Sequence, residues 1–342
     1  MTKKIILEYR EQGTYYDCQL ADIRKHFVVG KPDLLLPLTI GKKIVVFDEA
    51  QTIQDIGTIL KIFHDTYPET QIVATGSSSF SLAAQVGEPL VGRMFKYILY
   101  PLSMKEIFDH RESNLSDEEL NSLLVYGSYP EIITGKAESK IEYLTLLSSN
   151  FLYKDLAGFE EIRKPELLRN LVELLAYQIG NEVSYHELAT KLGVRRETIL
   201  RYIYMLEEAF IIFRLYPFSR NLRSEIGKKH KIYFYDLGVR NAVINKFSPT
   251  NARDDVGALW ENFCIMERKK QTQEKNWHRG TYFWRTTSQK EIDYIEEYNG
   301  SLYAYEFKWG GREYKIPKEF MNAYPGSSAV IVNKYNYLEW LS

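Results

Sequence analysis

The most constraining stretch of this 342-residue sequence is Lys42–Gln51, which reads Lys-Lys-Ile-Val-Val-Phe-Asp-Glu-Ala-Gln. Four consecutive apolar residues, Ile44–Phe47, follow a turn at Gly41 and lead directly into Asp48 and Glu49. Such a run predicts a buried strand of a parallel sheet. An ordinary buried strand avoids ending in two acids, because each carboxylate must be solvated or paired. The stretch therefore predicts an α/β domain with a functional edge where this strand ends.

At the carboxyl edge of a parallel sheet, two acids can hold a hydrated magnesium ion and orient an attacking water. The run resembles a Walker B strand, in which Asp48 would hold the metal and Glu49 would activate the water. The next apolar strand, Ile72–Ala74, ends at Thr75, and the polar run 75–79 suits a sensor of the terminal phosphate. The alternative is that Asp48 caps the following helix and Glu49 lies in its first turn, where the helix dipole favours acids.

Composition and charge limit the class of protein. The net charge of −1 argues against a bulk polyanion binder, so any nucleic-acid surface must be local. The two cysteines, Cys18 and Cys264, are too few for a disulfide framework or a cysteine zinc site. No apolar run approaches the roughly 20 residues that cross a bilayer, and the start lacks the hydrophobic region of a signal peptide. We therefore expect a cytoplasmic protein of two or three domains with no membrane partner.

A nucleotide-binding fold with this acidic strand should carry a glycine-rich phosphate loop just before its first helix, which the pattern places at residues 2–12. No Gly-Lys-Ser or Gly-Lys-Thr occurs in the sequence. Without the backbone donors and lysine of that loop, a triphosphate loses most of what would hold it. We therefore expect severely weakened nucleotide binding, and we expect the sequence to be truncated, assigned a late start or degenerate at this point.

Three further features are predicted between residues 90 and 165. Arg93 follows Gly92 in a loop and is a candidate arginine finger, the alternative being a solvated arginine. Tyr97–Tyr100 predicts a last strand of the core. From Ser103 the pattern is helical and acidic, with a capping box at Ser116–Glu119. This helical range resembles the lid that follows the core in AAA-type ATPases.

Residues 184–207 have the spacing of a helix-turn-helix, and the strand-like range 210–216 would follow as a wing. A short helix from Ser184 ends at Gly193, and a second helix follows. Its outward face carries the candidate DNA contacts Arg195, Arg196, Thr198 and Arg201. From 195 to 231, nine Lys/Arg (195, 196, 201, 214, 220, 223, 228, 229, 231) stand against four Glu (197, 207, 208, 225), a local net charge of +5. The alternative is a winged helix used for packing alone.

The C-terminal third predicts a helix over 258–270 and two strands, Glu291–Glu296 and Leu302–Lys308. Asn299-Gly300 between the strands is a strong hairpin signal. Side chains alternate along a strand, so residues 306 and 308 share a face.

This part of the sequence places three acids and a lysine in a recognisable order. Glu261 lies near the start of the helix, Asp293 lies on the first strand, and Glu306 and Lys308 lie on the second. That is the arrangement of a PD-(D/E)xK nuclease, in which the acids bind magnesium or manganese and the lysine positions the hydrolytic water. The alternative is an inert buried ion-pair cluster.

Ten stretches, in order, resemble the bacterial and archaeal AAA-type (STAND-like) ATPases that carry a C-terminal domain of unknown function. They are Ile44–Gln51, Ala74–Ser78, Gly92-Arg93, Pro101–Ser103, Gly127–Glu131, Pro217–Leu222, Lys231–Gly238, Gly257–Phe263, Tyr282–Arg285 and Glu291–Asp293. The resemblance implies ATP hydrolysis with ATP and magnesium as cofactors, and Asp48, Glu49, Thr75 and Arg93 as the catalytic set.

The expected fold class is α/β, with an incomplete P-loop NTPase core, a helical lid, a winged helix-turn-helix and a PD-(D/E)xK-like α+β domain. The expected boundaries are 1–101 for the truncated ATPase core, 102–166 for the lid, 167–216 for the winged helix and 217–342 for the nuclease-like domain. Alternative functions are a DNA-associated regulator and a metal-dependent nuclease.

Overall fold

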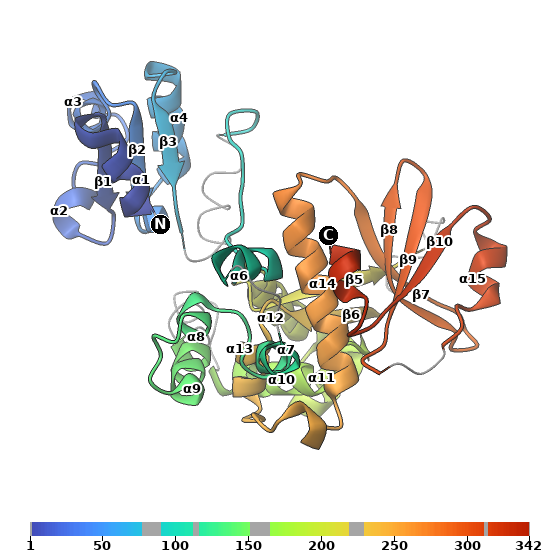
Figure 1. Ribbon diagram of the computed structural model, residues 1–342. Coiled ribbons are helices and arrows are strands. Elements are labelled where there is room, and N and C mark those ends of the chain that lie inside the picture. The colour runs from blue at the N-terminus through green and yellow to red at the C-terminus, as the bar shows by residue number, and fades with distance from the viewer. Residues whose placement is uncertain are drawn as a thin grey trace. The chain divides into compact units, whose positions relative to one another are not determined.

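A computed structural model describes residues 2–76, 90–111, 116–150, 165–218, 229–310 and 314–341 (Figure 1). The chain divides into two compact units: residues 1–98 with 208–210, here unit 1, and residues 99–207 with 211–342, here unit 2. Part of the predicted sensor run, 77–79, and part of the predicted basic region, 219–228 with Arg220, Arg223, Glu225 and Lys228, lie outside the described residues. Among the helices that the structure describes, none is long and apolar enough to cross a membrane.

Unit 1 is built on a parallel sheet with strand order β1-β2-β3. The strands are β1 (Gly13–Asp17), β2 (Ile44–Asp48) and β3 (Gln71–Ala74). Their register sets Asp17 opposite Asp48 and Phe47 opposite Ala74, so all three strands end at one edge. The helical elements are α1 (Thr2–Tyr9), η1 (Arg10–Gln12), α2 (Ala21–Arg24), α3 (Pro32–Leu35), η2 (Leu36–Leu38), η3 (Ala50–Thr52) and α4 (Ile56–Thr66).

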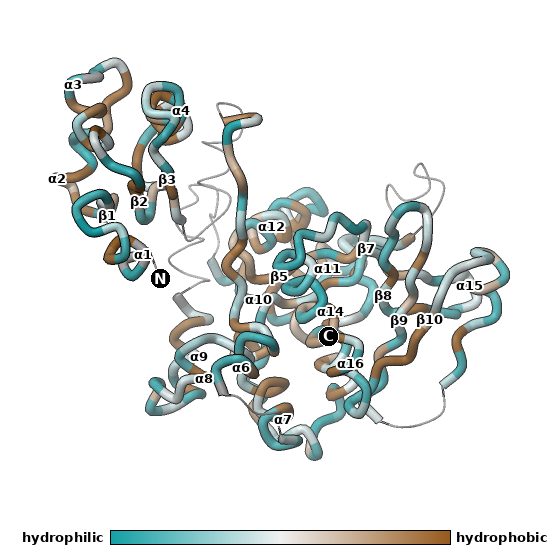
Figure 2. Tube along the Cα trace, turned by 45° about the horizontal axis from the view of Figure 1, so that its top comes forward, coloured by the Kyte–Doolittle hydropathy of each residue, from teal (hydrophilic) through white to brown (hydrophobic). Residues whose placement is uncertain are grey.

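The core of unit 1 forms because β2 is apolar on both faces, as its hydrophobic colour in Figure 2 shows. Phe47 is fully buried and stacks on Phe63 of α4 and on Tyr16 of β1, with ring centroids 5.4 and 5.7 Å apart. The apolar face of α4 packs into the same core through Ile56, Ile59, Leu60 and Phe63. The prediction that Ile44–Phe47 forms a buried strand is confirmed.

Two predicted strands differ from the observed ones. Tyr97–Tyr100 forms no strand, and Tyr97 is 79% exposed. A strand needs a neighbour to accept its backbone hydrogen bonds, and within the described residues β3 pairs with β2 alone. The strand predicted from Phe210 begins instead at Ile212, because Phe210 has the left-handed φ of +54° and cannot continue a ladder.

Unit 2 contains a sheet with strand order β10-β9-β8-β7-β5-β6-β4. Two sets of strands meet where β5 pairs with β7 through the short register Tyr216–Tyr282 and Pro217–Phe283. The predicted hairpin is confirmed, since Asn299 and Gly300 have positive φ between β8 and β9. The strands are β4 (Glu182–Val183), β5 (Ile212–Pro217), β6 (His230–Phe234), β7 (Gly280–Arg285), β8 (Glu291–Tyr298), β9 (Ser301–Phe307) and β10 (Ser328–Val332).

The helices of unit 2 begin and end as their capping residues predict. Ser116 and Glu119 form a capping box at the start of α7. Ser184 caps α11, and Gly193 ends it at a φ of +64°. The helical elements are α6 (Met104–Arg111), α7 (Asp117–Tyr126), α8 (Pro130–Ile133), α9 (Lys140–Asn150), α10 (Pro165–Tyr177), α11 (Tyr185–Leu192), α12 (Arg196–Glu208), α13 (Leu237–Val243), η6 (Thr250–Ala252), α14 (Val256–Glu274), α15 (Lys318–Ala323) and α16 (Tyr337–Leu341).

The helical range 104–150 packs closely on the C-terminal part of unit 2. A Cβ atom at Gly127 would lie 2.1 Å from Oδ1 of Asp236, and one at Gly238 would lie 2.2 Å from the carbonyl oxygen of Tyr126. The glycines therefore permit a backbone approach that no other residue allows. The ranges predicted as lid, winged helix and nuclease-like domain share one compact unit, and the last two share one sheet.

Candidate functional site

The carboxylate of Asp48 lies at the carboxyl end of β2 between two hydroxyl groups from the flanking strands. The hydroxyl of Tyr15 on β1 donates to one carboxylate oxygen, and the hydroxyl of Thr75, directly after β3, donates to the other. This hydrogen bond, together with burial and the negative charge of Asp48, raises the pKa of Tyr15 to about 12. Sequence reasoning found Asp48 and Thr75 but missed Tyr15.

Backbone hydrogen bonds hold this edge in place. The amide of Cys18 donates to the carbonyl of Asp48 at 2.9 Å, and the amide of Ala50 donates to the carbonyl of Thr75 at 2.9 Å. The 3-10 helix that follows Glu49 and the helix α4 that follows Asp55 carry no side-chain cap. The alternative in which Asp48 caps the next helix is therefore excluded.

Glu49, the predicted water-activating residue, has a left-handed backbone with φ +54° and ψ +42°. For a residue with a Cβ atom this conformation costs on the order of 1–3 kcal/mol, and such strain clusters at functional sites. The side-chain amide of Gln51 donates to Oε2 of Glu49 at 2.6 Å. One carboxylate oxygen of Glu49 thus accepts a hydrogen bond from a residue of the same turn.

Arg93, the predicted arginine finger, contacts the other end of the unit. Its Nε lies 3.1 Å from Oδ1 of Asp65, near the C-terminus of α4. Because α4 links the parallel strands β2 and β3, it starts at the Asp48 edge and runs back to the opposite edge, about 16 Å away for 11 residues. The structure therefore brings Asp48 and Thr75 together and leaves Arg93 with Asp65.

The four residues of the predicted nuclease site belong to a larger charged cluster in unit 2. Lys231 on β6 lies 2.9 Å from Oε1 of Glu261 and 3.8 Å from Asp293, and it also pairs with Glu291. The hydroxyl of Tyr233 donates to the same Glu261 oxygen at 2.5 Å. Sequence reasoning missed Lys231, Glu291 and Tyr233 as members of this cluster.

A second lysine closes the other side of the cluster. Lys308 donates to Oε1 of Glu306 at 2.6 Å and lies 3.7 Å from Oδ2 of Asp293. Asp293 accepts from the backbone amide of Phe307 at 2.9 Å, which ties β8 to β9. The predicted shared face of Glu306 and Lys308 is confirmed.

Burial sets the protonation of the cluster. Burial raises the pKa of Glu261 to about 7 against the opposing charge of Lys231, with Asp293 adding to the rise. Burial and Asp293 likewise raise the pKa of Glu306 to about 7, although Lys308 opposes the shift. Burial lowers the pKa of Lys231, but Glu261 and the other acids raise it well above its usual value. Lys231 is therefore a permanent cation within the cluster.

This arrangement bears on two expectations. Among the described residues no group of three or more His, Cys, Asp or Glu side chains is placed to hold a metal ion, and the metal-binding role of Glu261, Asp293 and Glu306 stays a prediction. Lys231 and Lys308 supply positive charge between these carboxylates. Lys231, 1% exposed, also does not belong to the basic DNA surface in which the sequence count placed it.

The predicted DNA-contacting residues lie at the start of α12. Arg195, Arg196 and Arg201 are exposed, and Thr198 is half-buried. Arg201 lies over the ring of Tyr202, with 5.7 Å between guanidinium and ring centroid. Arg214 pairs instead with Glu207 at 2.5 Å, so with Lys231 it reduces the charge that this surface can present.

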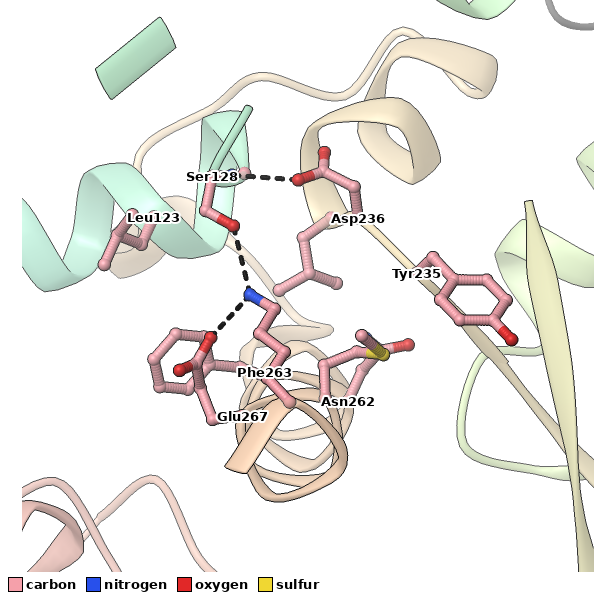
Figure 3. Close-up of a pocket in the computed structure, with 11 residues that line it drawn as sticks. Leu123, Ser128, Tyr235, Asp236, Asn262, Phe263 and Glu267 are labelled. Atoms are coloured by element: carbon pink, nitrogen blue, oxygen red, sulfur yellow. Dashed lines mark hydrogen bonds and ion pairs between the residues drawn. The ribbon is translucent and has the colours of Figure 1, made fainter. Parts of the chain in front are cut away.

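A small pocket in unit 2 is filled by a polar network. The ammonium group of Lys270 donates to the carbonyl of Leu102 at 2.9 Å, to Oγ of Ser128 at 3.2 Å and to Glu267 at 2.7 Å (Figure 3). Asp236 accepts from the amides of Ser128 at 2.8 Å and Val239 at 3.0 Å. These polar groups have partners in the protein, so the pocket is a structural junction.

Comparisons with known proteins address both ends of the chain. A family model described as an AAA domain matches residues 1–108. Two domains of unknown function follow, DUF8612 over residues 117–250 and DUF4143 over residues 256–340. The matches support an AAA-like ATPase family with a C-terminal domain of unknown function.

Individual relatives are uncharacterized proteins. One from Mycobacterium tuberculosis is 27% identical over 280 residues, 81% of this chain and 61% of the relative. One from Methanocaldococcus jannaschii is 25% identical over 270 residues, 74% of this chain and 58% of the relative. The chain thus spans about three fifths of the length of these relatives. A crystal structure of protein VC1899 from Vibrio cholerae aligns over 96% of this chain and 90% of that one, with 11% identity and a TM-score of 0.20.

Proposed function

We propose that unit 1 binds the magnesium complex of ATP at the edge where β2 and β3 end. The observation that carries the proposal is the Asp48 carboxylate held between the hydroxyls of Tyr15 and Thr75. The two hydroxyls orient the carboxylate at the sheet edge, where the acid of a magnesium-binding strand would lie. The AAA domain match over residues 1–108 supports the same assignment.

The donor set fits a hard divalent cation. Magnesium prefers oxygen ligands and keeps several waters, which needs one or two carboxylates rather than an all-protein cage. Asp48 would hold the hydrated ion, which when bound would offset the negative charge of the phosphates. Glu49 would accept a hydrogen bond from the attacking water, and Thr75 would donate to the terminal phosphate.

The residues that would cradle the phosphates are not found in these 342 residues, since no Gly-Lys-Ser or Gly-Lys-Thr occurs. Binding of the nucleotide by this chain therefore depends on the metal and on Asp48. We expect a dissociation constant in the millimolar range.

Mn²⁺ can replace magnesium as a paramagnetic probe of weak binding. Water-proton relaxation with ATP should report binding by the 342-residue chain, loss of binding in Asp48→Asn, and no change in Asp22→Asn, an exposed acid on α2 of the same unit. Equal binding by the wild type and Asp48→Asn would refute the assignment. Micromolar affinity would refute the expectation about the phosphate loop.

A second proposal is that unit 2 contacts DNA through α12. The element order α10, β4, α11, α12, β5, β6, with β6 between β5 and β4, supports a winged helix. Arg195, Arg196 and Arg201 are exposed at the start of α12, where a recognition helix makes its base and phosphate contacts.

Salt dependence tests this second proposal. Affinity for duplex DNA should fall linearly on a log-log plot as salt rises, and Arg195→Ala/Arg201→Ala should lower the slope by about one to two. Arg169→Ala/Lys191→Ala, at exposed positions that pair within their own helices, is the matched control and should leave the slope unchanged. Absent or salt-independent binding would leave these arginines as a solvated face.

For the C-terminal part we propose a nuclease-like fold that serves as a scaffold. The element order α14, β7, β8, β9, α15, β10 supports a PD-(D/E)xK-like arrangement, with Glu261, Asp293, Glu306 and Lys308 at its expected positions. The two lysines offset part of the negative charge of the cluster without metal. The nuclease alternative is tested below.

A further inference from the structure

The winged-helix part of unit 2 holds a tyrosine hydroxyl against a histidine ring nitrogen. Tyr185 is the first residue of α11, and His230 is the first residue of β6. The hydroxyl oxygen of Tyr185 lies 3.0 Å from Nδ1 of His230, and the two rings stack with centroids 5.7 Å apart. A nucleophile within hydrogen-bond reach of a base is the arrangement that covalent catalysis requires.

The surroundings keep His230 neutral. Burial lowers the pKa of His230 to about 4, and the positive charge of Arg214 adds to this shift. At pH 7 the imidazole therefore carries no charge, and in the tautomer with its hydrogen on Nε2 the Nδ1 atom accepts the hydrogen bond of the Tyr185 hydroxyl. Burial raises the pKa of Tyr185, whereas Arg214 opposes that shift. The hydroxyl thus keeps its proton at rest, and His230 is the base placed to remove it.

Arg214 on β5 supplies a positive charge to the same group of side chains. Its Nη2 atom pairs with Oε2 of Glu207 at 2.5 Å, which fixes the guanidinium group. Its Nε atom is buried and has no hydrogen-bond partner among the described residues. Guanidinium N–H groups form strong hydrogen bonds with phosphate oxygens. The arginine therefore has hydrogen-bonding capacity that Glu207 does not use.

This group of side chains reaches the surface through Tyr216, which shares a face of β5 with Arg214. Tyr216 is 43% exposed, and its ring lies 4.6 Å from the ring of His230 and 5.7 Å from the guanidinium of Arg214. Arg214 has 19% of its side chain exposed, and Tyr185 is 9% exposed. In a helix-turn-helix the first helix crosses the DNA backbone, and here that helix is α11, which begins at Tyr185.

We propose that Tyr185 is the nucleophile of a phosphodiester transfer on DNA, with His230 as its general base and Arg214 as the cation that stabilises the transition state. The inference rests on the proposed DNA contact of α12, which brings a phosphate backbone to this part of unit 2. The phenol oxygen of Tyr185 attacks phosphorus, Nδ1 of His230 takes the phenol proton, and the bond from phosphorus to one bridging deoxyribose oxygen breaks. His230 then returns the proton to that oxygen, so the products are a tyrosine phosphodiester and a free deoxyribose hydroxyl.

Duplex DNA with a bridging phosphorothiolate traps such a product, because the sulfur leaving group attacks the adduct poorly in the reverse direction. One duplex with a 5′-bridging and one with a 3′-bridging sulfur cover both polarities of cleavage. We expect the full chain to form a covalent adduct with the labelled strand that survives denaturation in SDS. Peptide mapping should place the adduct at Tyr185.

Variants separate the chemical roles from a structural role. Tyr185→Phe should abolish the adduct, because it removes the attacking oxygen and keeps the ring. Tyr177→Phe, at a tyrosine of α10 that is 64% exposed, is the matched control and should react at the wild-type rate. His230→Ala should slow the reaction by about 100-fold, and added imidazole should restore part of the rate, because it supplies the missing base. Circular dichroism checks that each variant is folded.

Fluorescence anisotropy with the same duplex separates this inference from the DNA contact of α12. Tyr185→Phe should bind the duplex within about twofold of the wild type, because it changes no charge. DNA binding without a covalent adduct would overturn the inference and leave the α12 proposal standing, whereas absence of DNA binding would overturn both. An adduct that persists in Tyr185→Phe, or a His230→Ala variant that reacts at the wild-type rate, would also contradict the inference.

Discussion

The Asp48 edge of unit 1 and the Lys231 cluster of unit 2 both place carboxylates on neighbouring strands, but they treat the charge differently. Asp48 is held by two neutral hydroxyls, from Tyr15 and Thr75. Glu261 and Asp293 face the ammonium group of Lys231, which is 1% exposed. The first arrangement surrounds its carboxylate with hydroxyl groups, whereas the second places a buried ammonium group among its carboxylates. Two sites with similar residue types therefore stabilise negative charge in different ways.

The largest expected effect comes from breaking the internal ion pairing. Lys231→Met should lower the free energy of unfolding of unit 2 by about 3–5 kcal/mol, because it leaves buried carboxylates without their cation. Urea denaturation followed by tryptophan fluorescence measures it, since Trp260 and Trp284 of unit 2 are buried.

Lys105→Met is the matched control. Lys105 pairs with Glu274 at the surface, where it is 61% exposed, and exposed pairs contribute little to stability because solvent screens them. Equal stability of Lys231→Met and Lys105→Met would mean that the cluster is not held by its lysine.

The second effect is a pH dependence of the free energy of unfolding of unit 2. Glu261 and Glu306 have folded-state pKa values of about 7, above the usual 4.5, so the folded state binds more protons than the unfolded state between these values. The free energy of unfolding of unit 2 should therefore fall as pH rises from about 4.5 to about 7, by an amount on the order of a few kcal/mol.

The variant Glu261→Gln/Glu306→Gln removes both titrating groups and should flatten this dependence. Glu118→Gln/Glu166→Gln, at two exposed acids of unit 2, is the control and should retain the wild-type slope. If the free energy of unfolding of Glu261→Gln/Glu306→Gln still fell with pH as in the wild type, the pH dependence would belong to other groups.

The third effect concerns metal and DNA cleavage. With Lys231 in place, Mn²⁺ at millimolar concentration should not bind at the cluster, and plasmid DNA should not be nicked. Asp293→Asn should then change neither Mn²⁺ binding nor plasmid integrity, whereas Asp48→Asn should abolish Mn²⁺ binding with ATP. Metal binding that is lost in Asp293→Asn, with nicking that is lost in both Asp293→Asn and Lys308→Ala, would instead establish a nuclease.

The smallest effect is a local titration. Asp48→Asn removes the carboxylate whose hydrogen bond and negative charge raise the pKa of Tyr15, so this pKa should fall from about 12 toward its usual value of 10. Carbon NMR of ring-labelled tyrosine, assigned with Tyr15→Phe, follows this shift. An unchanged pKa of Tyr15 in Asp48→Asn would show that the pKa of its hydroxyl does not depend on Asp48.

Sequence patterns predicted the parts of each site that follow from strand ends and turns. Asp48 and Thr75 could be placed together because parallel strands end at one edge, and the Asn299-Gly300 turn brought β8 and β9 into register. Tyr15 was missed because the local pattern does not show which strand pairs with β2, and only that pairing sets Tyr15 opposite Val46, close to the end of β2.

The burial and the ion partner of Lys231 could not be predicted from the local sequence pattern. The sequence counted it as part of a basic surface, but its neighbours Ile232, Tyr233 and Phe234 are all buried, so this strand is covered on both faces. A lysine in such an apolar run needs an internal partner. Its partner Glu261 comes from α14, 30 residues later, and only the packing of α14 on β6 joins the two.

The contact at Gly127 and Gly238 has a consequence for how this chain can change over generations. Each glycine makes room for a segment more than a hundred residues away, and any larger side chain at either position would meet backbone or a buried carboxylate. Recombination that exchanged only the helical segment 117–150 would succeed only with a donor that also preserves this fit. Unit 2 is therefore inherited as a whole.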